Sequence, residues 1–203
     1  MNRLQRIQNR YGQRWPVVVC VRAAQRTWRI RERITLGWLR LTTNGSKGNG
    51  ITIGPHVTVT PGSHLNLGDN LFIGARCIFE VSVNPLASVT IASNTWITHD
   101  CHICSYNRID IGSDVLIGEF VSLRDSSHSY SDHTIPMKNQ SDVRGHIVIE
   151  DDVWIGRGCL IQSKAEGVVI GRGAIIAANS VVSRSIPGME VWGGAPARFI
   201  KRR

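Results

Sequence analysis

The chain has 203 residues, which is enough for one sizeable hydrophobic core and too short to require two. Aromatic residues make up only 6% of it and glycines number 20, a composition that favours a β-rich, turn-rich fold over a helical bundle. The net charge of +9 comes from residues 1–47, and the remainder of the chain is nearly neutral. Because that remainder also shows no recognisable nucleic-acid-binding motif, no nucleic-acid partner is expected.

The first predicted element is an amphipathic helix from Val17 to Leu41, within a basic N-terminal segment of residues 1–46. Apolar residues occupy one half of this helix and arginines recur at helical spacing on the other. The arginine stripe consists of Arg22, Arg26, Arg29, Arg33 and Arg40. Two interpretations stay open: the helix lies on an anionic membrane surface, or it packs its apolar half on the protein body or a partner chain.

The chain is predicted to be cytoplasmic, with peripheral contact at the inner membrane face if the helix binds lipid. Its first residues are polar, and the apolar run VVVCV is too short for the core of a signal peptide. No apolar run approaches the ~20 residues that span a bilayer. The five cysteines, an odd number without framework spacing, are explained more simply as reduced thiols than as disulfides.

From Ile51 onward, an aliphatic residue returns every six positions, often followed by glycine. Six residues suit a short extended side and a corner, so three sides form a coil whose inward residues stack into a continuous core. The predicted inward triplets are Ile53/Val59/Leu65, Leu67/Ile73/Phe79, Ile91/Ile97/Ile103, Ile111/Ile117/Leu123, Ile149/Ile155/Ile161 and Ile170/Ile176/Val182. The fold class is therefore all-β, a parallel β-helix over residues 47–186. The general rule for parallel crossovers predicts a right-handed coil.

A polar segment, residues 124–146, interrupts the array and contains His128. Loops of more than 20 residues within a compact array are usually functional, so this extended loop is the first place to look for a site. An imidazole with a pKa near ~6.5 can accept a proton from a hydroxyl group and return it to a leaving group. We therefore interpret His128 as a candidate general base.

The array, the segment VWIGRGCLI and the ending VWGGAPARFIKRR resemble the hexapeptide-repeat acyltransferases, in particular the bacterial sugar O-acetyltransferases. The resemblance covers about residues 50–203. It implies a left-handed β-helix, a homotrimer, acetyl-CoA as co-substrate and no metal. It also implies that the acceptor is a carbohydrate hydroxyl in a surface polysaccharide or a lipid-linked glycan precursor. Direct transfer of this kind needs no covalent intermediate.

The resemblance also implies roles for individual residues. His128 matches the catalytic base by position, Asp125 is an orienting carboxylate or substrate ligand, and Asp100 and His102 are substrate contacts. The implied CoA contacts are Trp154, Gly156, Ala178, Ser183, Arg184, Arg198 and Lys201, the last two in a C-terminal tail of residues 187–203. Arg184 replaces the family's usual lysine and keeps the charge.

Other functions stay open. One is an antibiotic-type acetyltransferase of the same fold, with a drug hydroxyl as acceptor. Another is a zinc hydro-lyase similar to the γ-class carbonic anhydrases, in which His128 and His133 join His99 or His102 as ligands. A third is a non-catalytic assembly module. The pair Cys101 and Cys104 lacks a second CxxC motif and is interpreted as part of the wall or corner of the coil.

Overall fold

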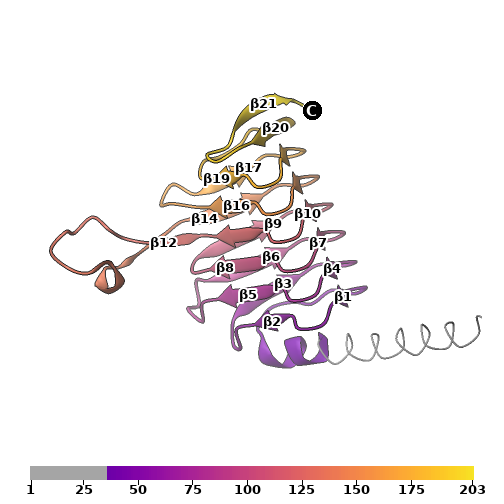
Figure 1. Ribbon diagram of the computed structural model, residues 1–203. Helices are drawn as coiled ribbons and strands as arrows, with labels where there is room; N and C mark the ends of the chain where they lie inside the picture. The colour runs from indigo at the N-terminus through magenta and orange to yellow at the C-terminus, as the bar shows by residue number, and fades with distance from the viewer. Residues whose placement is uncertain (1–35) are drawn as a thin grey trace, which may run out of the picture.

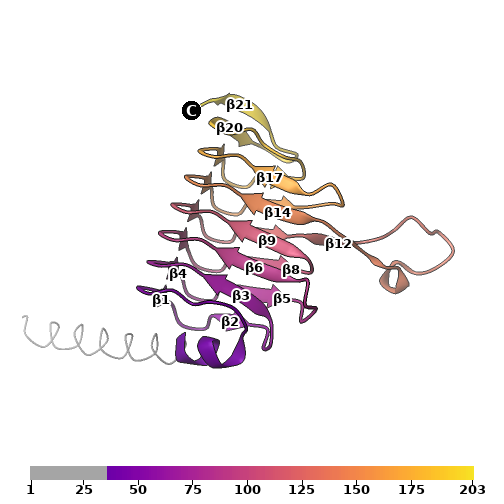
Figure 2. The same ribbon diagram turned by 180° about the vertical axis from the view of Figure 1, so that it is seen from behind.

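Short strands stack from one coil to the next into three sheets, parallel except for the final pair β20 and β21, and these sheets form the sides of a prism (Figure 1). The structure is a computed structural model and describes residues 36–203. The chain winds along the prism from β1 to β21, so the two ends of the described part lie at opposite ends of the prism (Figures 1 and 2). The mostly β, solenoid fold class is therefore confirmed.

Each side of the prism is called a face, and the described residues contribute the following strands. The first face contains β1 (Thr52–Ile53), β4 (Phe72–Ile73), β7 (Trp96–Ile97), β10 (Leu116–Ile117), β15 (Trp154–Ile155), β18 (Ile175–Ile176), β20 (Glu190–Gly193) and β21 (Arg198–Arg202). The second face contains β2 (Thr58–Val59), β5 (Ile78–Val81), β8 (His102–Ser105), β11 (Ser122–Arg124), β16 (Leu160–Gln162) and β19 (Val181–Val182). The third face contains β3 (His64–Leu67), β6 (Ser88–Ile91), β9 (Arg108–Ile111), β14 (His146–Ile149) and β17 (Val168–Ile170).

The core consists of aliphatic side chains held in ladders by the strand register. Ile97 pairs with Ile73 on one side and Ile117 on the other, and Ile117 pairs in turn with Ile155. All the inward positions predicted from the six-residue period are buried. Burying one such side chain stabilises the fold by ~1.5–3 kcal/mol, so these ladders are the main source of stability.

Two of the three corners have a constant length of four residues. The corner from the first to the second face comprises residues 54–57, 74–77, 98–101, 118–121, 156–159 and 177–180. The corner from the third to the first face comprises 68–71, 92–95, 112–115, 150–153 and 171–174. Constant corners keep every coil in register, because a one-residue slip would turn the inward side chains outward. Only the corner from the second to the third face varies in length.

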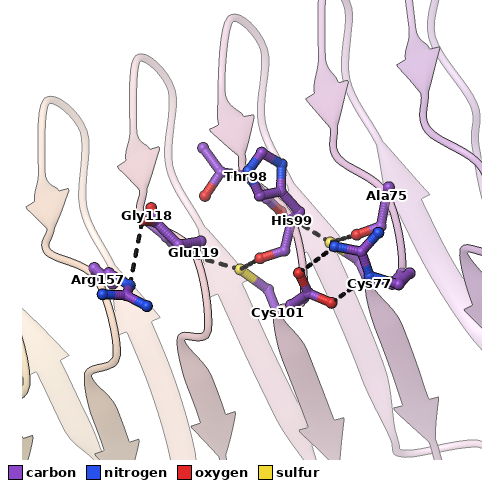
Figure 3. A network of polar contacts seen from close by, with 10 residues as sticks. Ala75, Cys77, Thr98, His99, Cys101, Gly118, Glu119 and Arg157 are labelled. Atoms are coloured by element: carbon purple, nitrogen blue, oxygen red, sulfur yellow. Dashed lines mark hydrogen bonds and ion pairs between the residues drawn. The ribbon is translucent and has the colours of Figure 1, made fainter.

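Buried thiols line the corner from the first to the second face (Figure 3). The Cys77 thiol donates to the carbonyl of Thr98 on the next coil at 2.9 Å, and the Cys101 thiol donates to that of Gly118 at 3.2 Å. The neighbouring Cys77 thiol and burial raise the pKa of Cys101, and burial raises the pKa of Cys159. Cys101 and Cys159 therefore stay protonated, and all three thiols pack in the corner, as interpreted for Cys101.

Residues 125–145 leave the variable corner as an arm that projects from the prism (Figures 1 and 2). Its base is an antiparallel hairpin of β12 (Ser126–His128) and β13 (Asp142–Arg144), and its outer part contains the 3₁₀ turn η2 (Met137–Asn139). The chain then re-enters the prism as β14, which pairs with β9 in unbroken register. The insertion therefore extends the molecule without disturbing the stack.

Residues 36–42 are helical, and Leu39 from this segment is buried in the core. The rest of the predicted Val17–Leu41 helix lies outside the described residues, as do its membrane and partner-chain interpretations. In the described part of the chain, no helix is long and apolar enough to cross a membrane.

Candidate active site

His128 ends the first strand of the hairpin, directly opposite Asp142 on the second strand. The Nδ1 atom of His128 lies 3.0 Å from Oδ1 of Asp142. A carboxylate at this distance favours the tautomer with the proton on Nδ1, so the lone pair on Nε2 is free to accept a proton. The arrangement of the two side chains is that of a base and the group that orients it.

Two cavities meet at His128. The first, the Arg124 cavity, has a volume of about 230 Å³ and is lined by Tyr106, Arg124, Ser126, Ser127, His128, Asp142 and Gln162. The second, the Lys164 cavity, has a volume of about 370 Å³ and is lined by Ser127, His128, Ser129, Tyr130, Ser131, Val143, Lys164, Ala165 and Glu166. A base that borders two cavities can serve a reaction between two bound molecules, one in each cavity.

The Arg124 cavity opens on the outer surface of the second face. Arg124 and Gln162 are register partners on adjacent strands, so their polar groups stand side by side. Burial raises the pKa of Tyr106, so its hydroxyl stays protonated and can donate a hydrogen bond. Guanidinium, amide and hydroxyl groups together offer the donors and acceptors that a polyhydroxylated ligand requires.

Asp125 does not face either cavity, and its predicted role as an orienting carboxylate or substrate ligand is not supported. Its side chain is fully buried and accepts hydrogen bonds from Ser105 Oγ at 2.8 Å, Tyr106 N at 2.7 Å and Asn107 N at 2.9 Å. These donors lie at the end of β8 and in the corner that follows it on the preceding coil, so Asp125 anchors the base of the arm. The carboxylate that contacts the His128 ring is that of Asp142, a residue of the same loop for which the sequence predicted no role.

Asp100 and His102 lie at the opposite end of the second face from His128, and neither lines the two cavities. Arg76 binds Asp100 through two contacts of 2.6 Å, and this hydrogen bonding lowers the pKa of the Asp100 carboxyl. His102 Nε2 lies 3.1 Å from Oε2 of Glu80. Within one chain, both predicted substrate contacts are therefore engaged by neighbours on the preceding coil.

The predicted CoA contacts occupy the last coils and do not line the two cavities. Trp154 stands half-exposed on the first face, with Leu116 and Ile175 as register partners. Gly156 and Ala178 lie in the four-residue corners that follow this face. The remaining four predicted contacts are exposed: Ser183 and Arg184 follow β19, and Arg198 and Lys201 belong to β21. They form a band along the prism rather than one cluster.

Gly156 has a packing requirement that is independent of any ligand. A Cβ at this position would lie 2.7 Å from the backbone nitrogen of Ala178 and 2.9 Å from the carbonyl oxygen of Ile176. We expect Gly156→Ala to lower the free energy of unfolding by about 1–3 kcal/mol, measured by denaturant unfolding without CoA. Gly37→Ala is the control, because a Cβ there meets nothing within 4 Å. Equal stability of both variants would point to a purely ligand-related role for Gly156.

The zinc arrangement proposed from the sequence is not assembled by the described residues. His128 and His133 do not join His99 or His102 in a group of three potential ligands. Within residues 36–203, the one group of three whose ligand atoms all lie within 4.8 Å of each other is Glu80, His102 and Cys104. The physical reason is the arm, which carries residues 128 and 133 away from residue 99 in the corner and residue 102 at the start of β8.

Comparisons with known proteins agree with this fold. Residues 146–184 match the family model described as the hexapeptide repeat of succinyl-transferase. The chain is 30% identical over 145 residues to the putative lipopolysaccharide biosynthesis O-acetyl transferase WbbJ of Escherichia coli, a match that covers 68% of this chain and 71% of WbbJ. At this identity and coverage, the chain belongs to the hexapeptide-repeat acyltransferase family.

Solved structures extend the agreement to three dimensions. An acetyltransferase of this repeat class from Vibrio cholerae, VCA0836 in complex with acetyl-CoA, superposes with a TM-score of 0.55 at 28% identity, covering 79% of this chain and 70% of that one. The N-acyltransferase AntD from Bacillus cereus, in complex with dTDP and 3-hydroxybutyryl-CoA, superposes with a TM-score of 0.65 at 22% identity, covering 83% and 88%.

The hand of the coil follows from this shared fold. The left-handed coil implied by the resemblance is confirmed, and the right-handed coil expected from the general crossover rule is wrong. That rule applies to twisted strands joined by long crossovers, usually helices. Here the strands that form the coil have only two to four residues and most corners have four, so that reason for a right-handed path is missing.

Proposed function

We propose that the chain transfers an acetyl group from acetyl-CoA to a hydroxyl group of a carbohydrate, with His128 as the general base. The observation that carries this proposal is the position of His128 between two cavities, with Nδ1 held by Asp142. Membership of the acyltransferase family and similarity to a structure that contains acetyl-CoA support the choice of co-substrate.

In the proposed reaction, Nε2 of His128 accepts the proton of the acceptor hydroxyl as its oxygen attacks the thioester carbonyl. The resulting imidazolium is stabilised by the Asp142 carboxylate on the other ring nitrogen. Collapse of the tetrahedral intermediate breaks the carbon–sulfur bond, and His128 returns its proton to the CoA thiolate. The products are an O-acetyl ester and CoA.

Each cavity is assigned one reactant. The Arg124 cavity suits the carbohydrate, because its lining offers several hydrogen-bonding groups close to His128. The Lys164 cavity also borders His128 and is assigned to the acyl end of the donor. The similarity to WbbJ supports a lipopolysaccharide-type acceptor, and the arginine pattern of the Val17–Leu41 segment favours a lipid-linked one.

A homotrimer would complete the donor site. Trp154, Gly156 and Ala178 lie near the start of the second face, whereas His128 lies beyond its end, so one chain does not bring them together. In the proposed trimer, a neighbouring copy places its own corner residues beside the arm of the first. Arg184, Arg198 and Lys201 then provide cations for the phosphates of CoA.

The proposal is tested by incubating the full chain with acetyl-CoA and an acceptor panel, while free thiol release and product mass are followed. We expect transfer to sugar nucleotides, simple glycosides or lipid-linked glycans, with a mass gain of one acetyl group. Transfer only to macrolide-type hydroxyls would favour the antibiotic-type alternative. Carbon dioxide hydration without CoA turnover would overturn the proposal in favour of a hydro-lyase, and inactivity in every assay would favour an assembly module.

A further inference from the structure

A second group of reactive side chains lies outside the proposed acyl-transfer chemistry, on the outer surface of the second face. Glu80 and Cys104 are register partners on β5 and β8, and His102 precedes Cys104 by two residues on the same surface. Alternation along a strand sends residues 102 and 104 to the same side, away from the inward Ile103. A carboxylate, an imidazole and a thiol from adjacent strands therefore converge.

The distance between the carboxylate and the imidazole matches that between two ligands of one metal ion, and the thiol lies close to both. The ligand atoms of all three residues lie within 4.8 Å of one another, and Glu80 Oε2 is 3.1 Å from His102 Nε2. Two light-atom ligands of a tetrahedral zinc ion, each ~2.0–2.1 Å from the metal, are separated by roughly 3.3 Å. Small side-chain rotations would bring the thiol sulfur to its longer ligand distance.

Cys104 differs from the other buried cysteines in its surroundings. The thiols of Cys77, Cys101 and Cys159 donate to main-chain carbonyls of the next coil, whereas Cys104, also buried, lies outside the core cluster beside Glu80. Burial, with a smaller contribution from Glu80, raises the pKa of Cys104 to about 11. Without a cation the thiol remains protonated, and a bound cation would replace that proton.

We propose that Glu80, His102 and Cys104 form a binding site for a divalent transition-metal ion, with zinc as the best fit. Imidazole and thiolate ligands select zinc over magnesium and calcium, which prefer oxygen ligands. The two negative ligands offset the charge of the ion, and the three protein ligands leave a fourth tetrahedral position for water. Binding releases the Cys104 proton to solvent.

The site is adjacent to the Arg124 cavity but separate from it. Cys104 pairs with Glu80 on one side and with Arg124 on the other, so the metal would lie one strand away from the cavity wall. Arg124 is a neighbouring cation that disfavours the ion, but its side chain lines the cavity that contains His128. His128 itself is not a ligand, so metal binding and acyl transfer can be tested independently.

The test uses cobalt(II) as a spectroscopic probe and zinc(II) as its competitor, on the full chain stripped with a chelator under reducing conditions. We expect one cobalt ion per chain, with a tetrahedral visible spectrum and a thiolate-to-cobalt charge-transfer band that zinc removes. Cys104→Ser should abolish the charge-transfer band. Cys159→Ser is the matched control, because it removes another buried thiol and should leave the band unchanged.

Glu80→Gln provides a second variant that does not threaten the fold, since the Glu80 side chain is 47% exposed. It should weaken cobalt binding by about 100-fold or more, because even outer-shell partners of a metal typically contribute 10–100-fold. His128→Ala should bind as the wild type does. The absence of a charge-transfer band, a band that persists in Cys104→Ser, or equal affinity of Glu80→Gln and wild type would overturn the site. Each of these outcomes leaves the acyl-transfer proposal untouched.

Discussion

Replacement of His128 by alanine is expected to lower kcat for acetyl transfer by about 10²–10⁴-fold, the usual contribution of a positioned general base. The side chain is exposed and its orientation depends on a single carboxylate, so its removal should leave the fold intact. Initial rates of thiol release at saturating acetyl-CoA measure the effect. Binding of acetyl-CoA should change little, which separates loss of the base from loss of the site.

The Asp142→Asn variant tests the same mechanism with a smaller expected effect on kcat. The amide cannot stabilise the imidazolium, so a fall in kcat smaller than that of His128→Ala is expected, with little change in KM. His133→Ala is the matched control, because this histidine lies exposed in the same arm and lines neither cavity. A wild-type rate for His128→Ala, or an equal loss for His133→Ala, would remove His128 from the catalytic role.

Replacement of Asp125 by alanine is expected to lower the free energy of unfolding by about 3 kcal/mol or more. The substitution removes the acceptor of the buried Ser105 hydroxyl and of the part-buried N–H groups of Tyr106 and Asn107, and each buried donor left unsatisfied costs roughly 1–3 kcal/mol. Denaturant unfolding without substrates measures the loss. The size of the effect reflects the position of Asp125, which ties the base of the arm to the preceding coil.

The control for this experiment is Asp142→Asn, in the same arm. Its carboxylate makes a partly exposed ion pair, and such pairs usually contribute ~0–1 kcal/mol, so its stability should stay close to that of the wild type. If the Asp125→Ala variant is as stable as the wild type but has a higher KM for the acceptor, the role of Asp125 as a substrate ligand is restored. The two variants thus separate an anchoring carboxylate from an orienting one.

The fold could be predicted almost completely from the sequence, because it depends on a local period. The six-residue repeat determines which side chain of each strand points inward, and residues as distant as Ile53 and Val182 obey it. Hand is not encoded in this period. It had to come from the resemblance, because the general rule rests on strand twist and long crossovers that this chain lacks.

The candidate site was harder to predict from the sequence, because it depends on contacts across the arm. His128 stands out as a polar residue in the interruption, but its partner Asp142 becomes recognisable only once β12 and β13 are known to pair. Asp125 is close to His128 in sequence, yet strand alternation and the end of β11 direct its carboxylate into the protein. The Glu80, His102 and Cys104 cluster also required the register of two strands. Nearness along the chain was a poor guide to nearness of functional groups.

The unequal corners have a consequence for how proteins of this architecture diversify. Two edges of the prism tolerate no change of length, because each must return the chain after four residues to hold the ladders. The third edge accepts segments from two residues (106–107) to the whole arm (125–145). New substrate ranges can therefore arise by exchange of segments along this single edge. Grafted arms of foreign sequence should be tolerated here, which makes the edge the natural target for engineering.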